Sequence, residues 1–188
     1  MNTESMVDYG PLTGLIGTWQ GDKGVDIAPE PDGIENNPYY ETLTFEAIGD
    51  VTNAEQQTLA VLQYRQRVTR KSNDQIFHDE CGYWMWDATK GVLMHSFSIP
   101  RGVTVLAGGS YTGPDNDDNL ILSVSAKRDD PDWQISQSPF MRDNARTDEF
   151  HRQITLSGGN LAYTQTTMLM IYDKRFEHTD DNELSRID

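Results

Sequence analysis

A polar pair of residues lies within the aromatic stretch 76–86, which reads IFHDECGYWMW. In an extended strand, side chains alternate between two faces, so His78 and Glu80 share one face with Trp84. An imidazole and a carboxylate at this spacing can bind a metal ion or anchor a polar group of a ligand; a structural hydrogen-bonded pair is the alternative. Because zinc takes three or four protein ligands, the pair alone indicates a metal only weakly. Aromatic residues occur on both faces, which predicts a strand buried on both sides, as in a wall around a ligand.

The other three histidines differ in their surroundings. His178 lies in an acidic segment, where its neutral imidazole could ligate a metal; alternatively it is solvated, with Glu177 and Asp180 favouring its protonated form. His95 shares a strand face with apolar residues, so it points into the same cavity as His78 or packs as a core histidine. His151 is expected on the outer surface.

Few other residues indicate catalysis by side chains alone. Cys81 is the single cysteine, so no disulfide within the chain and no cysteine-rich zinc site can form. We expect Cys81 to be buried and inert, since no partner constellation for a nucleophile is visible. Trp84, Met168 and Met170 suit the wall of an apolar pocket, although packing in an ordinary core is the commoner role of such residues.

The elements that must position these residues are short strands. Alternating apolar and polar residues recur between regular turn signals, most clearly at 119–127 and 147–156, and no long amphipathic helix is present. This pattern predicts an all-β chain forming a single up-and-down antiparallel barrel of about ten strands, similar to calycins and lipocalins. We expect one domain over residues 1–188, with a flexible arm at 1–10, a long loop at 22–38 and a polar tail at 174–188.

Composition excludes several partners. The 188 residues carry a formal charge of −15, which argues against nucleic acids and anionic membranes because phosphate binding depends on clustered Lys and Arg. The polar start lacks the apolar region of a signal peptide, and no apolar run is long enough to span a bilayer. We therefore expect a cytoplasmic protein. The oligomeric state is left open, with a homodimer as one option.

Several motifs, in order along the chain, resemble the nitrobindin-like, fatty-acid-binding-protein-like family of haem-binding β-barrels, also called the THAP4-type haem-binding domain of the calycin superfamily. The matching segments are Gly17-x-Trp19-x-Gly21, His78-x-Glu80-x-Gly82-Tyr83-Trp84, Phe97–Gly109, and Arg146–Leu156 followed by Leu161-Ala162-Tyr163. The chain departs from the family pattern after Gly21, where a Pro-rich insertion follows, and in the acidic residues around His178.

The resemblance implies a specific ligand. The best-studied members of the family bind haem b in a cleft at the barrel mouth and react with nitric oxide or peroxynitrite; members with that chemistry are called peroxynitrite isomerases. Carried over to this chain, the resemblance implies His178 as the axial ligand of the haem iron. His78, Trp84, Met168 and Met170 are then expected to line the pocket.

Three hypotheses for function remain open from the sequence. The leading one is a barrel that binds a small hydrophobic ligand, with haem b as the specific ligand and the chemistry supplied by the haem. The second is a carrier of a fatty acid or another small apolar or carboxylated molecule without haem, with Arg65 or Arg67 pairing the carboxylate. The third is an enzyme on the same barrel that uses His78, Glu80 and His95.

Overall fold

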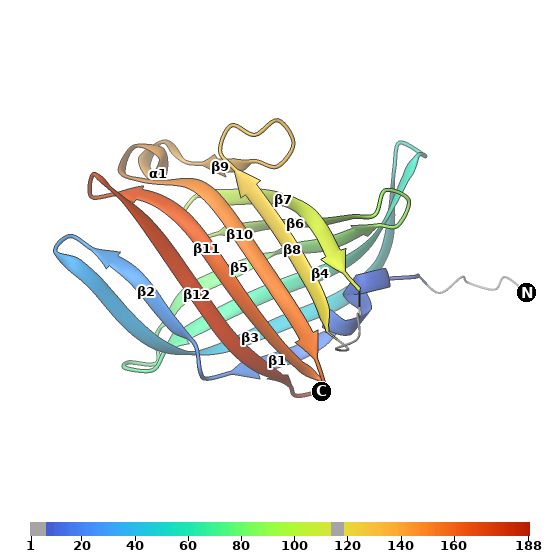
Figure 1. The fold of residues 1–188 in the computed structure, drawn as a ribbon, viewed down its shortest axis with the longest axis horizontal. Coiled ribbons are helices and arrows are strands. Elements are labelled where there is room, and N and C mark those ends of the chain that lie inside the picture. Colours follow the sequence, from blue (N-terminus) through green and yellow to red (C-terminus); the bar gives the residue numbers. More distant parts are fainter. Residues whose placement is uncertain (1–6, 114–118) are drawn as a thin grey trace, which may run out of the picture.

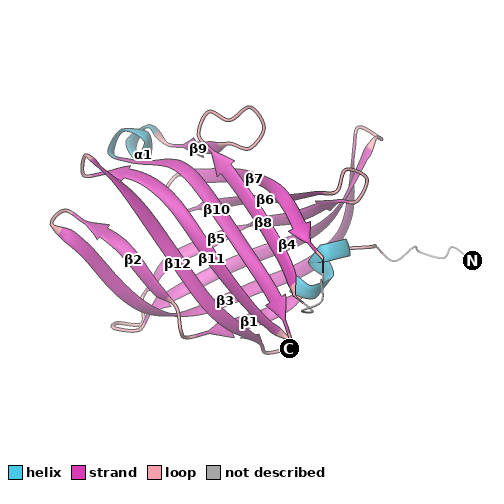
Figure 2. Ribbon diagram, in the orientation of Figure 1, coloured by secondary structure: helices cyan, strands magenta, loops and turns pink. Residues whose placement is uncertain are grey.

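The computed structural model describes residues 7–113 and 119–188, and these form an all-β molecule (Figure 1). Apart from a short 3-10 helix, η1, and a short α-helix, α1, the ordered elements are antiparallel strands (Figure 2). Within the described residues, neither helical segment is long and apolar enough to cross a lipid bilayer. The elements are η1 (Gly10–Leu15), β1 (Gly17–Gly21), β2 (Val25–Glu30), β3 (Gly33–Asn53), β4 (Gln57–Arg70), β5 (Ile76–Asp87), β6 (Val92–Ile99), β7 (Val103–Thr112), β8 (Leu120–Lys127), β9 (Ile135–Gln137), α1 (Pro139–Asn144), β10 (Ala145–Ser157), β11 (Asn160–Ile171) and β12 (Lys174–Arg186).

The sheet closes on itself into a barrel. Consecutive strands pair from β3 to β8, then β8 pairs with β10 and the series continues to β12. Strand β1 completes the circle because it pairs with β12 on one side and with β3 on the other. Ten strands therefore form a closed up-and-down barrel, and β2 and β9 are additions to it. The fold class predicted from the sequence is confirmed.

Strand β2 lies between β12 and β3, in the same gap of the barrel wall as β1 but further along it. It forms a hairpin with the start of β3, and it meets β12 through the single pair Thr179↔Ile27. The predicted loop at 22–38 is thus wrong for most of its length. Pro29 and Pro31 suggested a loop, but Pro29 lies near the end of β2, which has an extensive ladder only with β3, where proline is tolerated.

The predicted polar tail at 174–188 is also wrong, because residues Lys174–Arg186 form the full-length strand β12. Its inward-facing positions are largely polar and face other polar groups, so the segment lacks the apolar alternation of a typical strand. Of the arm expected at 1–10, residues 1–6 lie outside the described residues. Tyr9, which is described, accepts a hydrogen bond from the amide of Gly49 at 2.8 Å.

One end of the barrel interior is apolar and closed. Leu12 and Leu15 of η1 are fully buried there with Trp19, whose indole N–H donates to the carbonyl of Leu15 at 2.8 Å. Burial of these side chains anchors η1 across the end of the barrel, since each large apolar side chain removed from water stabilises the fold by about 1.5–3 kcal/mol. Trp19 therefore has a structural role.

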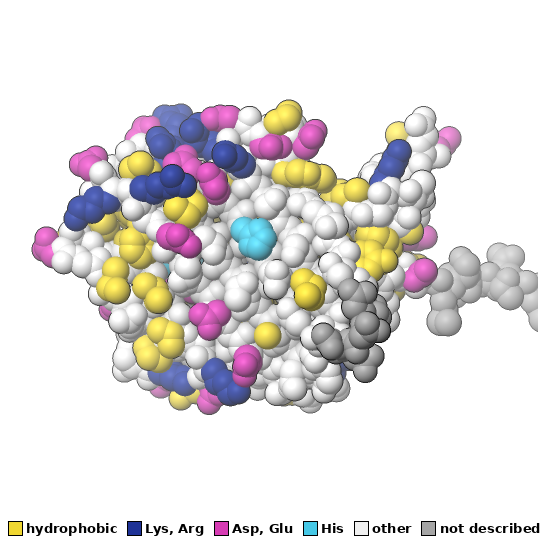
Figure 3. Space-filling view, viewed as in Figure 1, with side chains coloured by type: hydrophobic (Ala, Val, Ile, Leu, Met, Phe, Trp, Pro, Cys, Tyr) yellow, Lys and Arg dark blue, Asp and Glu magenta, His cyan; other side chains and the backbone are white. Residues whose placement is uncertain are grey.

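The two faces of β5 differ sharply in exposure. Glu80 and Trp84 point inward and are buried, whereas Cys81 is exposed and Tyr83 is 43% exposed on the outer face. The predictions that β5 is buried on both sides and that Cys81 is buried are wrong, because single aromatic residues are tolerated on a water-facing surface. Figure 3 shows such mixing on one face, where acidic, basic and hydrophobic side chains are interspersed around the end that carries α1 and β9.

Candidate functional site

A layer of buried polar side chains crosses the barrel interior, away from the end closed by η1. Each side chain occupies an inward position of its strand, so alternation along the strands brings them together. The layer comprises Tyr39 and Glu41 of β3, Tyr64 and Gln66 of β4, Glu80 of β5, Arg152 of β10, Tyr163 of β11 and Asn182 of β12. Buried polar groups are stable only when hydrogen-bonded, and in this layer they bind one another.

An ion pair between Arg152 and Glu80 forms one half of the layer. Nη1 of Arg152 donates to Oε1 of Glu80 at 3.0 Å, and Nη2 donates to Oε1 of Gln66 at 2.7 Å. The Tyr64 hydroxyl also donates to Glu80. Burial raises the pKa of Glu80, and the charge of Arg152 opposes that rise. The two opposite charges offset each other in a part of the interior that excludes water.

Glu41 is the centre of the other half. Its carboxylate accepts hydrogen bonds from Gln66 Nε2 at 2.6 Å, Asn182 Nδ2 at 2.6 Å and the Tyr163 hydroxyl at 3.0 Å. The hydroxyls of Tyr163 and Tyr39 lie 3.0 Å apart. Burial raises the pKa of Glu41 to about 7, against the lowering effect of these donors. The layer is therefore a polar floor beneath the open end of the barrel.

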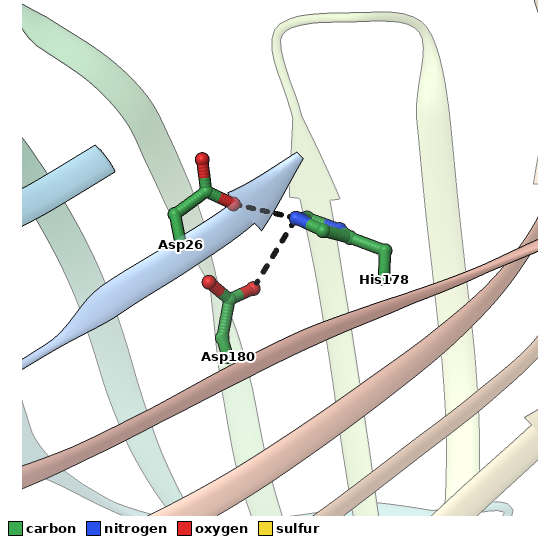
Figure 4. Close-up of side chains that lie close together, drawn as sticks. All are labelled: Asp26, His178 and Asp180. Carbon is green, nitrogen blue, oxygen red and sulfur yellow. Dashed lines mark hydrogen bonds and ion pairs between the residues drawn. The ribbon is translucent and has the colours of Figure 1, made fainter. Parts of the chain in front are cut away.

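His178 lies beyond this floor, between two carboxylates (Figure 4). Its Nε2 is 2.6 Å from Oδ1 of Asp26, on β2, and 3.8 Å from Oδ2 of Asp180, which lies two residues along β12. Burial alone would lower the pKa of His178, but the hydrogen bond to Asp26 and the charge of Asp180 outweigh it, so the pKa is raised. Burial, together with the neighbouring Asp26, raises the pKa of Asp180 to about 6 despite the favourable charge of His178. Among the described residues, these three form the group that could hold a metal ion.

A cleft of about 310 Å³ opens between the turn of the β2–β3 hairpin and the turn that joins β11 to β12, and its nearest lining residue on β12, Phe176, is two positions from His178. Phe176 lines this cleft and shares the inner face of β12 with His178, because the two are separated by two positions. Ile171, Pro29 and Pro31 add apolar surface, Lys174 adds a positive charge, and Glu30 and Asp32 add two carboxyl groups. The cleft thus combines apolar and charged groups, and its volume is at the lower end of the range of ligand sites.

His78 also faces this end of the interior. Its Nε2 lies 3.4 Å from Oε2 of Glu80. Burial, followed by the charges of Arg152, Arg101 and His178, lowers the pKa of His78 to about 4, so its imidazole is neutral at pH 7. The pair predicted from the sequence is therefore present as a structural contact linked to Arg152, and it is separate from the group that could hold a metal.

The two methionines lie on the other face of the wall from His178. The register pairs Thr167 with His178, so Thr167 and Leu169 face inward, whereas Met168 and Met170 pair with Glu177 and Arg175 on the outer face. The structure therefore does not bring Met168 or Met170 to His178. The sequence around them is apolar at successive positions, so the pattern there did not reveal which residues face inward.

Trp84 and His95 occupy the apolar core. Their rings stack with centroids 4.3 Å apart, and both side chains are fully buried. Burial lowers the pKa of His95 well below its usual value, and neither ring nitrogen has a hydrogen-bond partner among the described residues. His95 is thus a core histidine rather than part of the cleft. His151 is exposed on β10, as predicted.

Arg65 and Arg67 lie outside the barrel. Arg65 pairs with Asp79 at 2.6 Å, and both arginines line a larger but open hollow of about 1130 Å³ on the outer face of β3–β6. That hollow lies across the barrel wall from the polar floor, and Glu41 and Tyr64 of the floor also contribute to its lining. The arginine that does face inward is Arg152, which sequence reasoning missed. The signal was present: Arg152 lies two positions from both Phe150 and Ile154, so strand alternation places all three on one face.

Comparisons with known proteins agree with this architecture. Residues 8–186 match the family model described as the THAP4-like, heme-binding beta-barrel domain. The structure of Rv2717c from M. tuberculosis is similar, with a TM-score of 0.70 and 21% sequence identity over 96% of this chain and 100% of that one. A search of curated proteins finds no match. The structural similarity shows the fold alone at this level of identity, whereas the family match spans nearly the whole chain. The protein therefore belongs to the family of THAP4-like, heme-binding beta-barrel domains.

Proposed function

We propose that this barrel binds haem b at its open end, with His178 as the axial ligand of the iron. The observation that carries the proposal is the position of His178, an inward-facing imidazole two positions along β12 from Phe176, which lines the cleft, in a barrel whose family is described as haem-binding. Imidazole nitrogen is a common protein ligand of haem iron. Met168 and Met170 have no part in the proposal, and Leu169 and Phe176 take their place as inward-facing apolar neighbours.

The apolar residues around the cleft fit a haem, whereas three acidic residues oppose it. Phe176, Ile171 and the two prolines offer apolar contact for a flat macrocycle, and Lys174 offers a positive charge for a propionate. Glu30 and Asp32 also line the cleft and would repel a propionate. Asp26 holds Nε2 of His178 at 2.6 Å. Coordination through that nitrogen requires the hydrogen bond to Asp26 to break first.

The residues of this chain contribute binding and exclusion. His178 supplies the nitrogen that ligates the iron, and the second carboxylate, Asp180, remains near the imidazole at 3.8 Å. The polar floor formed around Arg152 and Glu41 closes the interior below the cleft, so a diatomic ligand reaches the site from the mouth. When bound, haem supplies the nitric oxide and peroxynitrite chemistry that we propose for this protein.

A hemin titration followed by absorbance tests the proposal. Wild-type protein is expected to saturate at one equivalent with a sharp Soret band. The variant His178→Ala is expected to bind at least about tenfold more weakly, because losing even a residue behind a metal ligand costs 10–100-fold. His151→Ala is the matched control, since it removes an exposed imidazole from the outer face. Equal binding and equal spectra in all three proteins would refute the assignment of His178.

A fatty-acid carrier without haem is less well supported. The arginines considered for carboxylate binding lie outside the barrel, and the inward-facing Arg152 is already paired with Glu80. A ligand carboxylate would have to displace Glu80 to reach it. Native mass spectrometry of the purified protein compares the two candidates directly, because a co-purified lipid and a bound haem differ in mass.

A further inference from the structure

The β2–β3 hairpin is firmly built within itself but lightly attached to the strand beside it. Strand β2 makes six register pairs with β3, from Val25↔Pro38 to Glu30↔Gly33, and one pair with β12, Thr179↔Ile27. Figure 1 shows the hairpin (blue) standing beside β12 (red), and the cleft described above separates the turns at their ends. A hairpin held in this way can separate from β12 without losing its own ladder.

Asp26 forms the closest side-chain contact across this junction. Oδ1 of Asp26 lies 2.6 Å from Nε2 of His178, whereas Lys174 Nζ donates to the carbonyl of Pro31 at 3.5 Å on the exposed side. Asp26 is buried, with 6% of its surface exposed. A short contact between an ionised carboxylate and an imidazole is among the stronger hydrogen bonds in proteins, particularly where water is excluded.

The hairpin itself orients this carboxylate. Asn37 of β3 donates to Oδ2 of Asp26 at 3.3 Å and also to the carboxylate of Glu35 at 3.0 Å. Both Asp26 and Asn37 are buried, so their mutual positions are fixed by the hairpin rather than by β12. Asp26 therefore moves with the hairpin, and its contact with His178 depends on how close the hairpin lies to β12.

We propose that Asp26 is the latch of a lid formed by the β2–β3 hairpin, residues 25–38, and that the latch regulates access to His178. In the closed state Asp26 occupies Nε2, and the hairpin covers one side of the mouth. In the open state the hairpin separates from β12, and Nε2 becomes available to an incoming iron porphyrin. This inference rests on the proposed function, because it assigns a regulator to the same histidine.

The proposal makes the observed affinity depend on the open population. If haem binds the open state, the apparent dissociation constant equals the intrinsic constant divided by the fraction of open molecules. Removing the latch should therefore accelerate hemin association, whereas fixing the lid in place should slow it. The two perturbations have opposite signs, which separates gating from a general loss of stability.

A reversible disulfide lock provides the first test. Ile27 and Thr179 face each other across β2 and β12, and they alternate with Asp26 and His178, so they lie on the outer face. Facing residues in antiparallel strands have Cα atoms about 4.5–5.5 Å apart, within the range a disulfide spans. The lock is Ile27→Cys with Thr179→Cys in a Cys81→Ser background. Thr52→Cys with Thr58→Cys, a facing pair near the turn between β3 and β4, is the matched control.

Stopped-flow absorbance with hemin gives the association rates. The oxidised Ile27–Thr179 lock is expected to bind at least about tenfold more slowly than its reduced form, and the control pair should bind equally in both forms. Asp26→Ala is expected to bind about tenfold faster than wild type, the factor associated with a hydrogen bond to a charged group. Asp181→Ala, which makes the same charge change at an exposed position of β12, should leave the rate unchanged.

Hydrogen exchange of the apo-protein tests the lid without haem. In Asp26→Ala, the amides at the junction of β2 and β12, around Ile27 and Thr179, should exchange at least about tenfold faster, while those of β10 keep their wild-type protection. Unchanged exchange at this junction, or a lock that does not alter hemin association, would overturn the latch. If His178→Ala binds hemin normally, the proposed function fails instead, and the exchange result still decides whether Asp26 holds the hairpin.

Discussion

The variant Arg152→Met removes the only positive charge that pairs with Glu80 among the described residues of the barrel interior. Arg152 is 3% exposed and Glu80 is 1% exposed, so the carboxylate left behind cannot be solvated without disturbing the fold. Removing one partner of a buried ion pair costs about 3–5 kcal/mol of unfolding free energy. A domain has only about 5–15 kcal/mol in total, so the loss is a large fraction of the stability.

Urea unfolding followed by tryptophan fluorescence measures this loss of unfolding free energy. A thermal melt reports the same loss as a change in Tm. For a chain of this size, 1 kcal/mol corresponds to about 2–4 °C, so Tm is expected to decrease by roughly 6–20 °C. The double variant Glu80→Gln with Arg152→Met should recover a substantial part of the loss, since a buried amide needs no counter-charge.

The pH dependence of the single variant has a definite sign. Burial already raises the pKa of Glu80, with Arg152 opposing, so removing Arg152 raises it further. A carboxyl whose pKa is higher in the folded state stabilises the fold at low pH. That stabilisation is lost as the pH rises above the ordinary carboxyl pKa of 4.5. The deficit of Arg152→Met should therefore be smallest below that pH. A cost under about 1 kcal/mol at pH 7, or a double variant no more stable than the single one, would refute the reasoning.

Two further predictions concern the polar floor and the barrel wall. Because burial raises the pKa of Glu41 to about 7 from 4.5, this one group should lower wild-type stability by about 3 kcal/mol as the pH rises from 4.5 to 8. In Glu41→Gln this pH-dependent loss of stability should be absent when urea unfolding is measured at pH 4.5 and pH 8. A variant with the same pH dependence as wild type would contradict the prediction. Gly82→Ala should destabilise the barrel by about 1–3 kcal/mol, because a Cβ there would overlap the carbonyl oxygen of Ser96. A thermal melt that matches wild type would show that the strands can shift to accommodate it.

The barrel could be predicted from the sequence because most of its strands carry apolar residues on the inner face and polar residues on the outer face. Segments such as 119–127 alternate apolar and polar residues, and only β-structure has that period. β2 and β12 lack this signal. Proline and glycine mark the β2–β3 hairpin, and polar and charged residues make up most of β12, whose inward side faces polar groups rather than an apolar core.

The candidate site could be predicted only in part. His178 was identified through the family resemblance, but Asp26 was not, since the two residues are 152 positions apart and meet only after the barrel closes. Met168 and Met170 were expected in the pocket because they are apolar. The face on which they lie depends on the register between β11 and β12, which the sequence does not reveal. Likewise, the exposure of Cys81 depends on which face of β5 points outward.

Imidazole rescue of His178→Gly tests the central claim most directly, because it asks whether this side chain is itself the ligand. The variant should bind hemin weakly with a shifted Soret band, and added imidazole should restore the wild-type spectrum and one-to-one stoichiometry. The control His151→Gly should show the wild-type spectrum with or without imidazole. A His178→Gly protein that binds hemin with the wild-type spectrum before any imidazole is added would contradict axial ligation by His178.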